Sequence, residues 1–168
     1  RYNEIDNFNI YGNERYIYQY ISEKYPEVEV KFDTEKIKLT TIDIEVASEN
    51  GFPDVESCAE EVLLITLQDY ATKQIRTWGR GTFNNKQENV IYKGFNTEYE
   101  LLTDFIHWWM IEDNTPEVIT GWNSKLYDIP YLCRRIDRIL GEKLKKRMSP
   151  WGLVTEEETY ISGRKHLS

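Results

Sequence analysis

The feature that most constrains the fold is a stretch that alternates like a β-strand but carries two acids, Lys-Leu-Thr-Thr-Ile-Asp-Ile-Glu-Val at residues 38–46. Side chains two positions apart on a strand point to the same face, so Ile42 and Ile44 can face a core while Asp43 and Glu45 share the opposite face. Two carboxylates on one face repel each other unless water or a cation neutralises them. Most Asp-x-Glu pairs lie on a solvated sheet face without chemistry, so a metal site requires a further acid nearby in space.

The composition limits the class of protein. With 168 residues, 40% of them hydrophobic, the chain is long enough for one domain and a small additional segment. A net charge of -8 argues against a broad basic surface for duplex DNA, so any contact with nucleic acid should be local, through metals and stacking. The two cysteines, Cys58 and Cys133, favour reduced packing residues and a cytoplasmic location. No apolar run is long enough to span a membrane, and no membrane partner is expected.

The order of predicted elements indicates an α/β fold. Residues 1–27 are rich in tyrosine, contain a predicted helix over 16–24 and are assigned to the end of an N-terminal domain; residues 28–168 form the main domain. Thr97 and Glu100 match a capping box at the start of a predicted helix over 97–111. The succession of strand, helix and strand around it implies a crossover and parallel pairing, and hence a mixed sheet with flanking helices. The predicted strands cover residues 28–32, 38–46, 61–67, 74–78, 90–92 and 118–122.

A third acid, Asp128, follows the strand predicted at 118–122. It precedes a predicted helix whose apolar stripe runs to Gly141, and it could be no more than the N-cap of that helix. If the 118–122 strand lies parallel and next to the 38–46 strand, however, all three acids emerge at the carboxyl edge of one sheet, where open α/β sheets bind ligands. Asn123 at the same edge could contact a substrate or be an ordinary turn residue.

The loop after the first two acids contains Gly51-Phe52-Pro53, which breaks regular structure next to them. Phe52 could cover the core as a lid or offer a stacking surface to a base. The residue types alone favour the lid.

These motifs resemble those of family B DNA polymerases. Asp43-Ile-Glu45 resembles the first exonuclease motif of that family, and Asn123-Ser-Lys-Leu-Tyr127-Asp128 resembles the second, Asn-x-x-x-Phe/Tyr-Asp, in the expected order. The resemblance spans about residues 16–150 and is nearest to the T-even type of phage replicative polymerase. The flanking segments that carry it are Tyr20–Tyr25, Gly51–Pro53, Phe95–Leu102, Ile119–Asn123, Asp128–Tyr131 and Lys146–Pro150.

The resemblance implies an RNase H-like (DnaQ-type) exonuclease domain that removes mispaired nucleotides from a primer 3′ end with two divalent cations. Oxygen ligands suit Mg²⁺ or Mn²⁺. Asp43 would bridge the two metals, Glu45 would bind one and help to place the attacking water, and Asp128 would serve the other. The implied DNA-binding and supporting residues are Phe52, Asn123 and Tyr127.

One motif of the family is missing. The third exonuclease motif, Tyr-x-x-x-Asp, would supply another metal ligand and a tyrosine that orients the water, and no segment after Asp128 matches it. We therefore expect a fragment of a DNA-directed DNA polymerase: an exonuclease domain incomplete at its C-terminus, without the polymerase domain, and weak or inactive alone.

The expected partners are the single-stranded 3′ end of a primer and the rest of the polymerase chain. We expect a monomer, located in the host cytoplasm if it is encoded by a phage. The alternative is a non-catalytic RNase H-like module that binds single-stranded DNA or a protein partner.

Overall fold

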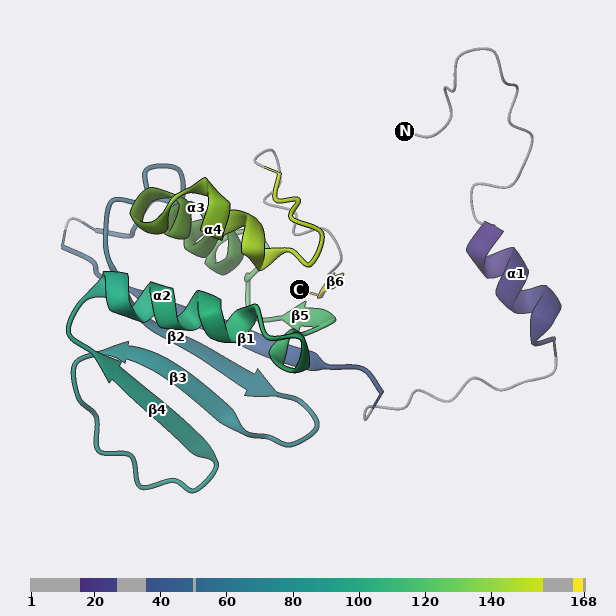
Figure 1. Ribbon diagram of the computed structural model, residues 1–168, viewed down its shortest axis with the longest axis horizontal. Coiled ribbons are helices and arrows are strands. Elements are labelled where there is room, and N and C mark those ends of the chain that lie inside the picture. The colour runs from purple at the N-terminus through teal and green to yellow at the C-terminus, as the bar shows by residue number, and fades with distance from the viewer. Residues whose placement is uncertain (1–15, 27–35, 50, 156–164, 168) are drawn as a thin grey trace, which may run out of the picture. The chain divides into compact units, whose positions relative to one another are not determined.

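The computed structural model describes residues 16–26, 36–49, 51–155 and 165–167 (Figure 1). The chain divides into two compact units, Arg1–Phe32 and Asp33–Ser168. In the first unit, helix α1 (Tyr16–Lys24) confirms the helix predicted over 16–24. The predicted domain boundary after residue 27 and the strand predicted at 28–32 lie outside the described residues, so both stay predictions.

The second unit is built on a six-stranded mixed sheet with the order β4-β3-β2-β1-β5-β6. The pairs β1–β2 and β2–β3 are antiparallel, whereas β3–β4, β1–β5 and β5–β6 are parallel. The strands before and after helix α2 (Glu98–Trp109), β4 and β5, are not neighbours as the predicted parallel pairing implied, because β3, β2 and β1 lie between them. The parallel neighbour of β5 is β1, the arrangement that would bring the three acids to one edge of the sheet. The strands are β1 (Leu39–Val46), β2 (Val62–Asp69), β3 (Ile75–Arg80), β4 (Val90–Phe95), β5 (Val118–Thr120) and β6 (Lys165–Leu167).

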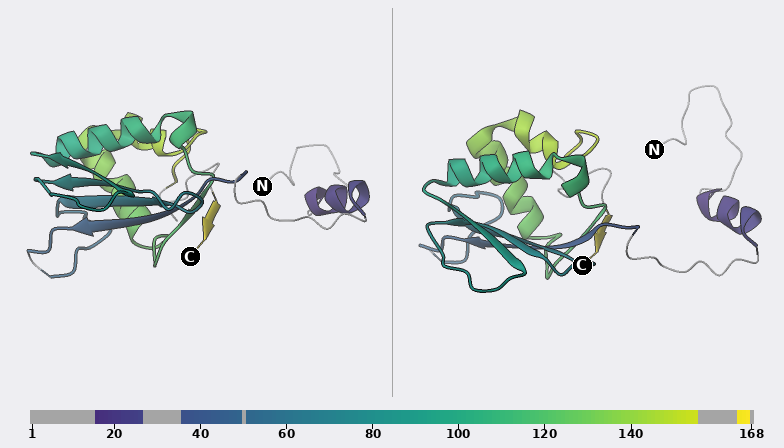
Figure 2. Two further views of the ribbon diagram at one scale, coloured as in Figure 1. Left: turned by 90° about the horizontal axis from the view of Figure 1, so that it is seen from below. Right: turned by 60° about the horizontal axis from the view of Figure 1, so that its bottom comes forward.

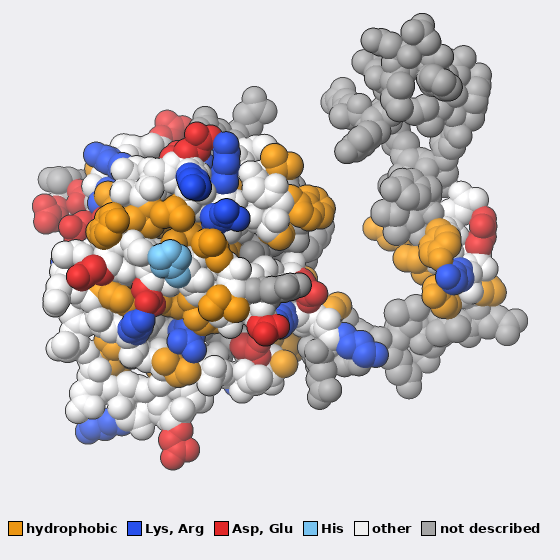
Figure 3. Space-filling view, viewed as in Figure 1, with side chains coloured by type: hydrophobic (Ala, Val, Ile, Leu, Met, Phe, Trp, Pro, Cys, Tyr) orange, Lys and Arg blue, Asp and Glu red, His pale blue; other side chains and the backbone are white. Residues whose placement is uncertain are grey.

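Helices cover one face of this sheet, as the two views of Figure 2 show for α2. They are α2 (Glu98–Trp109), α3 (Asp128–Leu140) and α4 (Glu142–Lys145), with two short 3₁₀ helices, η1 (Glu112–Asn114) and η2 (Lys146–Met148). No helix among the described residues is long and apolar enough to cross a membrane. The face seen in Figure 3 mixes hydrophobic, acidic and basic side chains over its described part without a continuous basic area, in line with the negative net charge.

Helix α2 begins where its capping box predicted. The Thr97 side chain accepts a hydrogen bond from the Glu100 N–H, and the Glu100 side chain accepts one from the Thr97 N–H at 3.1 Å. The apolar side of the helix packs on the sheet through aromatic rings. The ring of Trp78 of β3 contacts that of Phe105 edge-on, with 5.3 Å between the ring centroids, and its centroid lies 5.1 Å from that of Trp108. The helix thereby buries the side of the sheet that carries the core.

Strand β1 separates core from cleft by its alternation, as predicted. Ile42 and Ile44 are buried in the core, whereas Asp43 and Glu45 are exposed on the other face. Pairing between β1 and β5 stops at Thr41 and Thr120, because β5 ends at Thr120 and not near residue 122 as predicted. The second half of β1 therefore extends beyond its neighbour.

Glycine at position 121 allows the chain to turn tightly against β1 at this point. A Cβ atom there would lie 2.4 Å from the Ile42 carbonyl oxygen and 2.9 Å from the Ser124 Cβ, closer than atoms can approach. The turn after β5 consequently starts beside the acidic half of β1.

Candidate active site

Asp128 binds the edge of β1 beyond the end of β5. Its Oδ1 accepts a hydrogen bond from the Ile44 backbone N–H at 3.0 Å, although the two residues are 84 positions apart. Tyr127 is the N-cap of α3 and Asp128 is the first helical residue, so the interpretation of Asp128 as an N-cap is wrong. The physical reason is that the edge of β1 beyond β5 has donors to satisfy, and the buried carboxylate provides an acceptor there.

The three acids line one cleft. Asp43 and Glu45 are the residues before and after Ile44, so their strand delivers them to either side of the N–H group that Asp128 binds. The cleft has a volume of about 450 Å³. All six predicted site residues line it: Asp43, Glu45, Phe52, Asn123, Tyr127 and Asp128. Its remaining walls come from Ile44, Val46, Ser48, Pro53 and Trp122.

Asp128 has a pKa that burial and neighbouring charges shift upward. Burial raises its pKa above the ordinary 3.8, and the negative charges of Asp43 and Glu45 raise it further, whereas the hydrogen bond from Ile44 lowers it. The neighbouring Tyr127 also has a raised pKa, because its phenol is partly buried and lies near the Asp128 carboxylate. A bound cation would relieve both the repulsion and the desolvation.

The donor chemistry of the cleft fits a hard divalent cation. Carboxylate oxygens are the ligands that Mg²⁺ and Mn²⁺ prefer. The side chains of Asp43 and Glu45 make no hydrogen bond or ion pair with any residue that the structure describes, so their carboxylate oxygens remain available. Within the same described ranges, no group of three or more Asp, Glu, His or Cys side chains is already gathered tightly enough to hold an ion.

The aromatic and amide residues of the cleft are placed by two loops. Phe52 is 83% exposed, with its ring 5.1 Å from that of Tyr127, so it does not cover the core and the lid interpretation is wrong. Asn123 has a positive φ of 54°, and its carbonyl accepts the N–H groups of Leu126 and Tyr127, each at 3.0 Å. The backbone of Asn123 therefore builds the turn before α3, while its exposed side chain borders the cleft.

Sequence reasoning missed Trp122. It was placed at the end of a buried strand, but β5 ends earlier and Trp122 is 97% exposed at the rim of the cleft. The available signal was its position between Gly121 and Asn123, since a turn there carries its side chains out of the sheet.

The raised pKa of Asp128 predicts a measurable dependence of stability on pH. Because the folded state holds the Asp128 proton to a higher pH than the unfolded state, this contribution to stability is full below pH 3.8 and is lost as the pH rises through the raised value. Asp128→Asn keeps the acceptor for the Ile44 N–H without the charge. In the absence of divalent ions, this variant should therefore be more stable than the wild type at pH 7 and lose that advantage near pH 4.

Urea denaturation of both proteins at the two pH values measures this difference. Glu88→Asn, at an exposed acid outside the cleft, serves as the control and should show no such crossover. An Asp128→Asn difference that stays constant between the two pH values would contradict the raised pKa.

Comparison with known proteins places this chain in a family. The model of the DNA polymerase family B exonuclease domain matches residues 3–166. The DNA-directed DNA polymerase of Escherichia phage RB69 is 31% identical across 78% of this chain and 17% of its own length. That of Enterobacteria phage T4 is 31% identical across 80% of this chain and 17% of its own length. The DNA polymerase catalytic subunit of Human herpesvirus 6B (strain Z29) is 33% identical across 73% of this chain and 13% of its own length.

The chain thus spans 17% of the length of the two phage relatives. Its mixed sheet with flanking helices is the RNase H-like α/β fold expected for such a domain, which confirms the predicted fold class. Because the family model matches almost the whole chain, this protein belongs to the exonuclease-domain family of family B DNA polymerases.

Proposed function

We propose that this chain is the proofreading 3′-5′ exonuclease part of a replicative DNA polymerase. The observation that carries the proposal is the contact of Asp128 with the Ile44 N–H, because it brings a buried carboxylate into the cleft that the exposed Asp43 and Glu45 also line. The reaction would be hydrolysis of the 3′-terminal phosphodiester: water adds to phosphorus, the bond to the 3′ oxygen breaks and a 5′-mononucleotide leaves.

Asp43, Glu45 and Asp128 would hold two divalent cations, Mg²⁺ or Mn²⁺. When bound, such ions would activate the attacking water and stabilise the departing 3′ oxygen. Asp128 is held in place by the Ile44 N–H, so it keeps one oxygen fixed while the other is left for a ligand. The exposed carboxylates of Asp43 and Glu45 would complete the ligand set from β1.

Phe52, Tyr127 and Asn123 would bind the single-stranded primer end. A base stacked on an exposed aromatic ring gains affinity without a preference for sequence, which suits an activity that removes any mispaired nucleotide. Phe52 is 83% exposed although its ring touches that of Tyr127, so much of the Phe52 ring is accessible to a base. The acidic protein would thus bind DNA through stacking and metals.

Hydrolysis by this chain should be slow, because no segment after Asp128 matches the Tyr-x-x-x-Asp motif that would add a further ligand and a tyrosine near the water. The remainder of a polymerase chain is the proposed partner that would supply the missing parts. The monomeric state and the cytoplasmic location stay predictions.

Degradation of a single-stranded oligonucleotide labelled at its 5′ end tests the proposal. With Mn²⁺, the chain should shorten the strand one nucleotide at a time from the 3′ end, and EDTA should stop the reaction. Phe52→Ala should raise KM about 10-fold, within the range that the loss of one stacked base produces, and leave kcat nearly unchanged. Phe52→Trp is the matched control and should retain the activity of the wild type.

Complete absence of shortening, together with tight binding of the same oligonucleotide without any metal effect, would favour the non-catalytic binding module. Shortening from the 5′ end would rule out the proposed polarity. Fast degradation by the isolated chain would support the function but contradict its expected slowness.

A further inference from the structure

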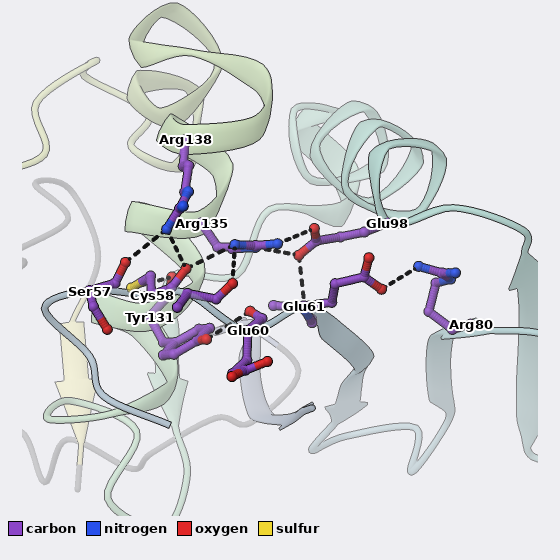
Figure 4. A network of polar contacts seen from close by, with 11 residues as sticks. Ser57, Cys58, Glu60, Glu61, Arg80, Glu98, Tyr131, Arg135 and Arg138 are labelled. Carbon is purple, nitrogen blue, oxygen red and sulfur yellow. Dashed lines mark hydrogen bonds and ion pairs between the residues drawn. The ribbon is translucent and has the colours of Figure 1, made fainter. Parts of the chain in front are cut away.

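Four side chains of α3 bind the loop that leads from Phe52 to β2. Figure 4 shows three of them, Tyr131, Arg135 and Arg138. We call residues 51–61 the Phe52 loop, and Tyr131, Arg134, Arg135 and Arg138 the α3 clamp. Tyr131 and Arg134, like Arg135 and Arg138, are three positions apart, and Tyr131 and Arg135, like Arg134 and Arg138, are four apart, so they lie on one side of the helix. They donate to the carbonyls of Val55, Ser57, Cys58, Ala59 and Glu60 at distances between 2.8 and 3.2 Å.

The Phe52 loop depends on these donors because its backbone is irregular. Asp54 makes a turn by accepting the Ser57 N–H at 2.7 Å, and Cys58 has a positive φ of 41°. Carbonyl groups in such a segment have no neighbouring strand to bind, and leaving them unpaired against a packed helix would be costly. The clamp supplies their partners, so the shape of the loop follows the position of α3.

Arg135 is the anchor of the clamp. Its Nε and Nη2 bind both oxygens of Glu98 at 2.7 Å, and its Nη1 donates to the carbonyls of Cys58 and Ala59 at 2.9 and 3.1 Å. Glu98, from the first turn of α2, also accepts the Val62 N–H at 2.9 Å. A planar guanidinium with this many bonds is fixed in direction. The end of the Phe52 loop is therefore tied to two helices and to the start of β2.

The helix that carries the clamp also starts the candidate active site. Asp128 is the first residue of α3, and the ring of Tyr127 lies 5.1 Å from Phe52 and 5.6 Å from Tyr131. The hydroxyl of Tyr131 in turn donates to the Glu60 carbonyl at 2.8 Å. One rigid element thus positions both the buried carboxylate and the loop that bears Phe52.

We propose that the α3 clamp is a positioning device for the DNA strand, in which Arg138 is a further positioning residue. By holding the Phe52 loop on α3, it fixes the distance between the base stacked on Phe52 and the carboxylates that act on the terminal phosphodiester. The proposal rests on the proposed function. Misplacing a bound group relative to the reacting groups is costly even when no reacting group is altered.

Arg138→Ala is the suitable variant, because Arg138 is exposed and its loss removes the contacts to Ser57 and Cys58 without uncovering a buried charge. The readout is the affinity of the full chain for a single-stranded oligonucleotide with 2-aminopurine at its 3′ end, in Ca²⁺, followed by the fluorescence of the stacked base. We expect affinity to fall about fivefold, part of what one stacked base contributes. Arg147→Ala also removes one positive charge, but Arg147 lines a different pocket from the cleft, so this variant should leave affinity unchanged.

A double variant separates positioning from simple attraction of DNA. If Arg138 acts through Phe52, Phe52→Ala with Arg138→Ala should bind no more weakly than Phe52→Ala alone, and the thermal midpoint of Arg138→Ala should remain near that of the wild type. Two independent losses that multiply, or an equal loss in Arg147→Ala, would overturn the positioning role. An unchanged affinity in Arg138→Ala beside a reduced one in Phe52→Ala would overturn it while leaving the proposed function intact. No loss in Phe52→Ala would count against the proposed function itself.

Discussion

Asp128→Ala is expected to weaken the binding of Mn²⁺ to this chain by at least about 100-fold, because even the loss of an outer-shell partner of a metal ligand costs 10- to 100-fold. Asp43→Ala should have an effect of the same size. Asp128 is the acid that the fold holds in place through the Ile44 N–H, and the charge of Asp43 raises the pKa of Asp128 more than the charge of Glu45 does. Removing either one would leave only two carboxylates to hold a pair of divalent cations.

A Mn²⁺ titration followed by thermal unfolding and by tryptophan fluorescence measures this loss, since Trp122 lies at the rim of the cleft. Asp128→Asn keeps an acceptor for the Ile44 N–H and distinguishes loss of a ligand from loss of the fold. Glu88→Ala removes one exposed acid outside the cleft and should bind Mn²⁺ like the wild type. Equal Mn²⁺ midpoints in Asp43→Ala, Asp128→Asn and the wild type would favour the non-catalytic module.

Arg135→Ala is expected to have the largest effect on stability, a loss of about 3–5 kcal/mol in the free energy of unfolding, as when one partner of a buried ion pair is removed. Arg135 and Glu98 have side chains only 7% and 5% exposed. The substitution would leave the Glu98 carboxylate buried with the Val62 N–H, and would remove the donor from the carbonyls of Cys58 and Ala59. Glu98→Ala should cost a similar amount, because it leaves the guanidinium uncompensated.

Urea denaturation of both single variants and of the double variant measures the pair. The double variant should lose less than the sum of the single losses, because each single substitution already abolishes the same contact. Lys146→Ala breaks an exposed ion pair with Glu142 and is the control; its loss should be a small fraction of that of Arg135→Ala. Additive losses, or a loss in Arg135→Ala no larger than that of Lys146→Ala, would contradict the role assigned to the buried pair.

Much of the fold was predictable because the decisive interactions are local. The alternation around Ile42 and Ile44 defined the faces of β1, and Thr97 with Glu100 marked the start of α2. Hydrophobic periodicity and capping depend on neighbours only a few residues apart, so they can be recognised without a structure. The length of β5 was overestimated, because apolar residues continue past the point where the chain turns at Gly121.

The candidate site was predictable as a set of residues and unpredictable as a set of contacts. The six residues that the sequence suggested all line the cleft, together with five others. They did not reveal that Asp128 binds the Ile44 N–H and not the start of its own helix, that Phe52 is exposed, or that Trp122 stands at the rim. The contact of Asp128 and the position of Trp122 both depend on where β5 ends beside β1.

The sequence by itself determined the alternating strand, the capped helix and the chemical identity of the acids, because these follow from side-chain type and short-range spacing. Only the tertiary structure decided which donors those acids meet and how the Phe52 loop is held. Asp128 and Ile44 are 84 residues apart, and Arg135 and Glu98 are 37 apart. Contacts over such separations are made when whole elements pack, since burial leaves each polar group to find whichever partner the neighbouring element presents.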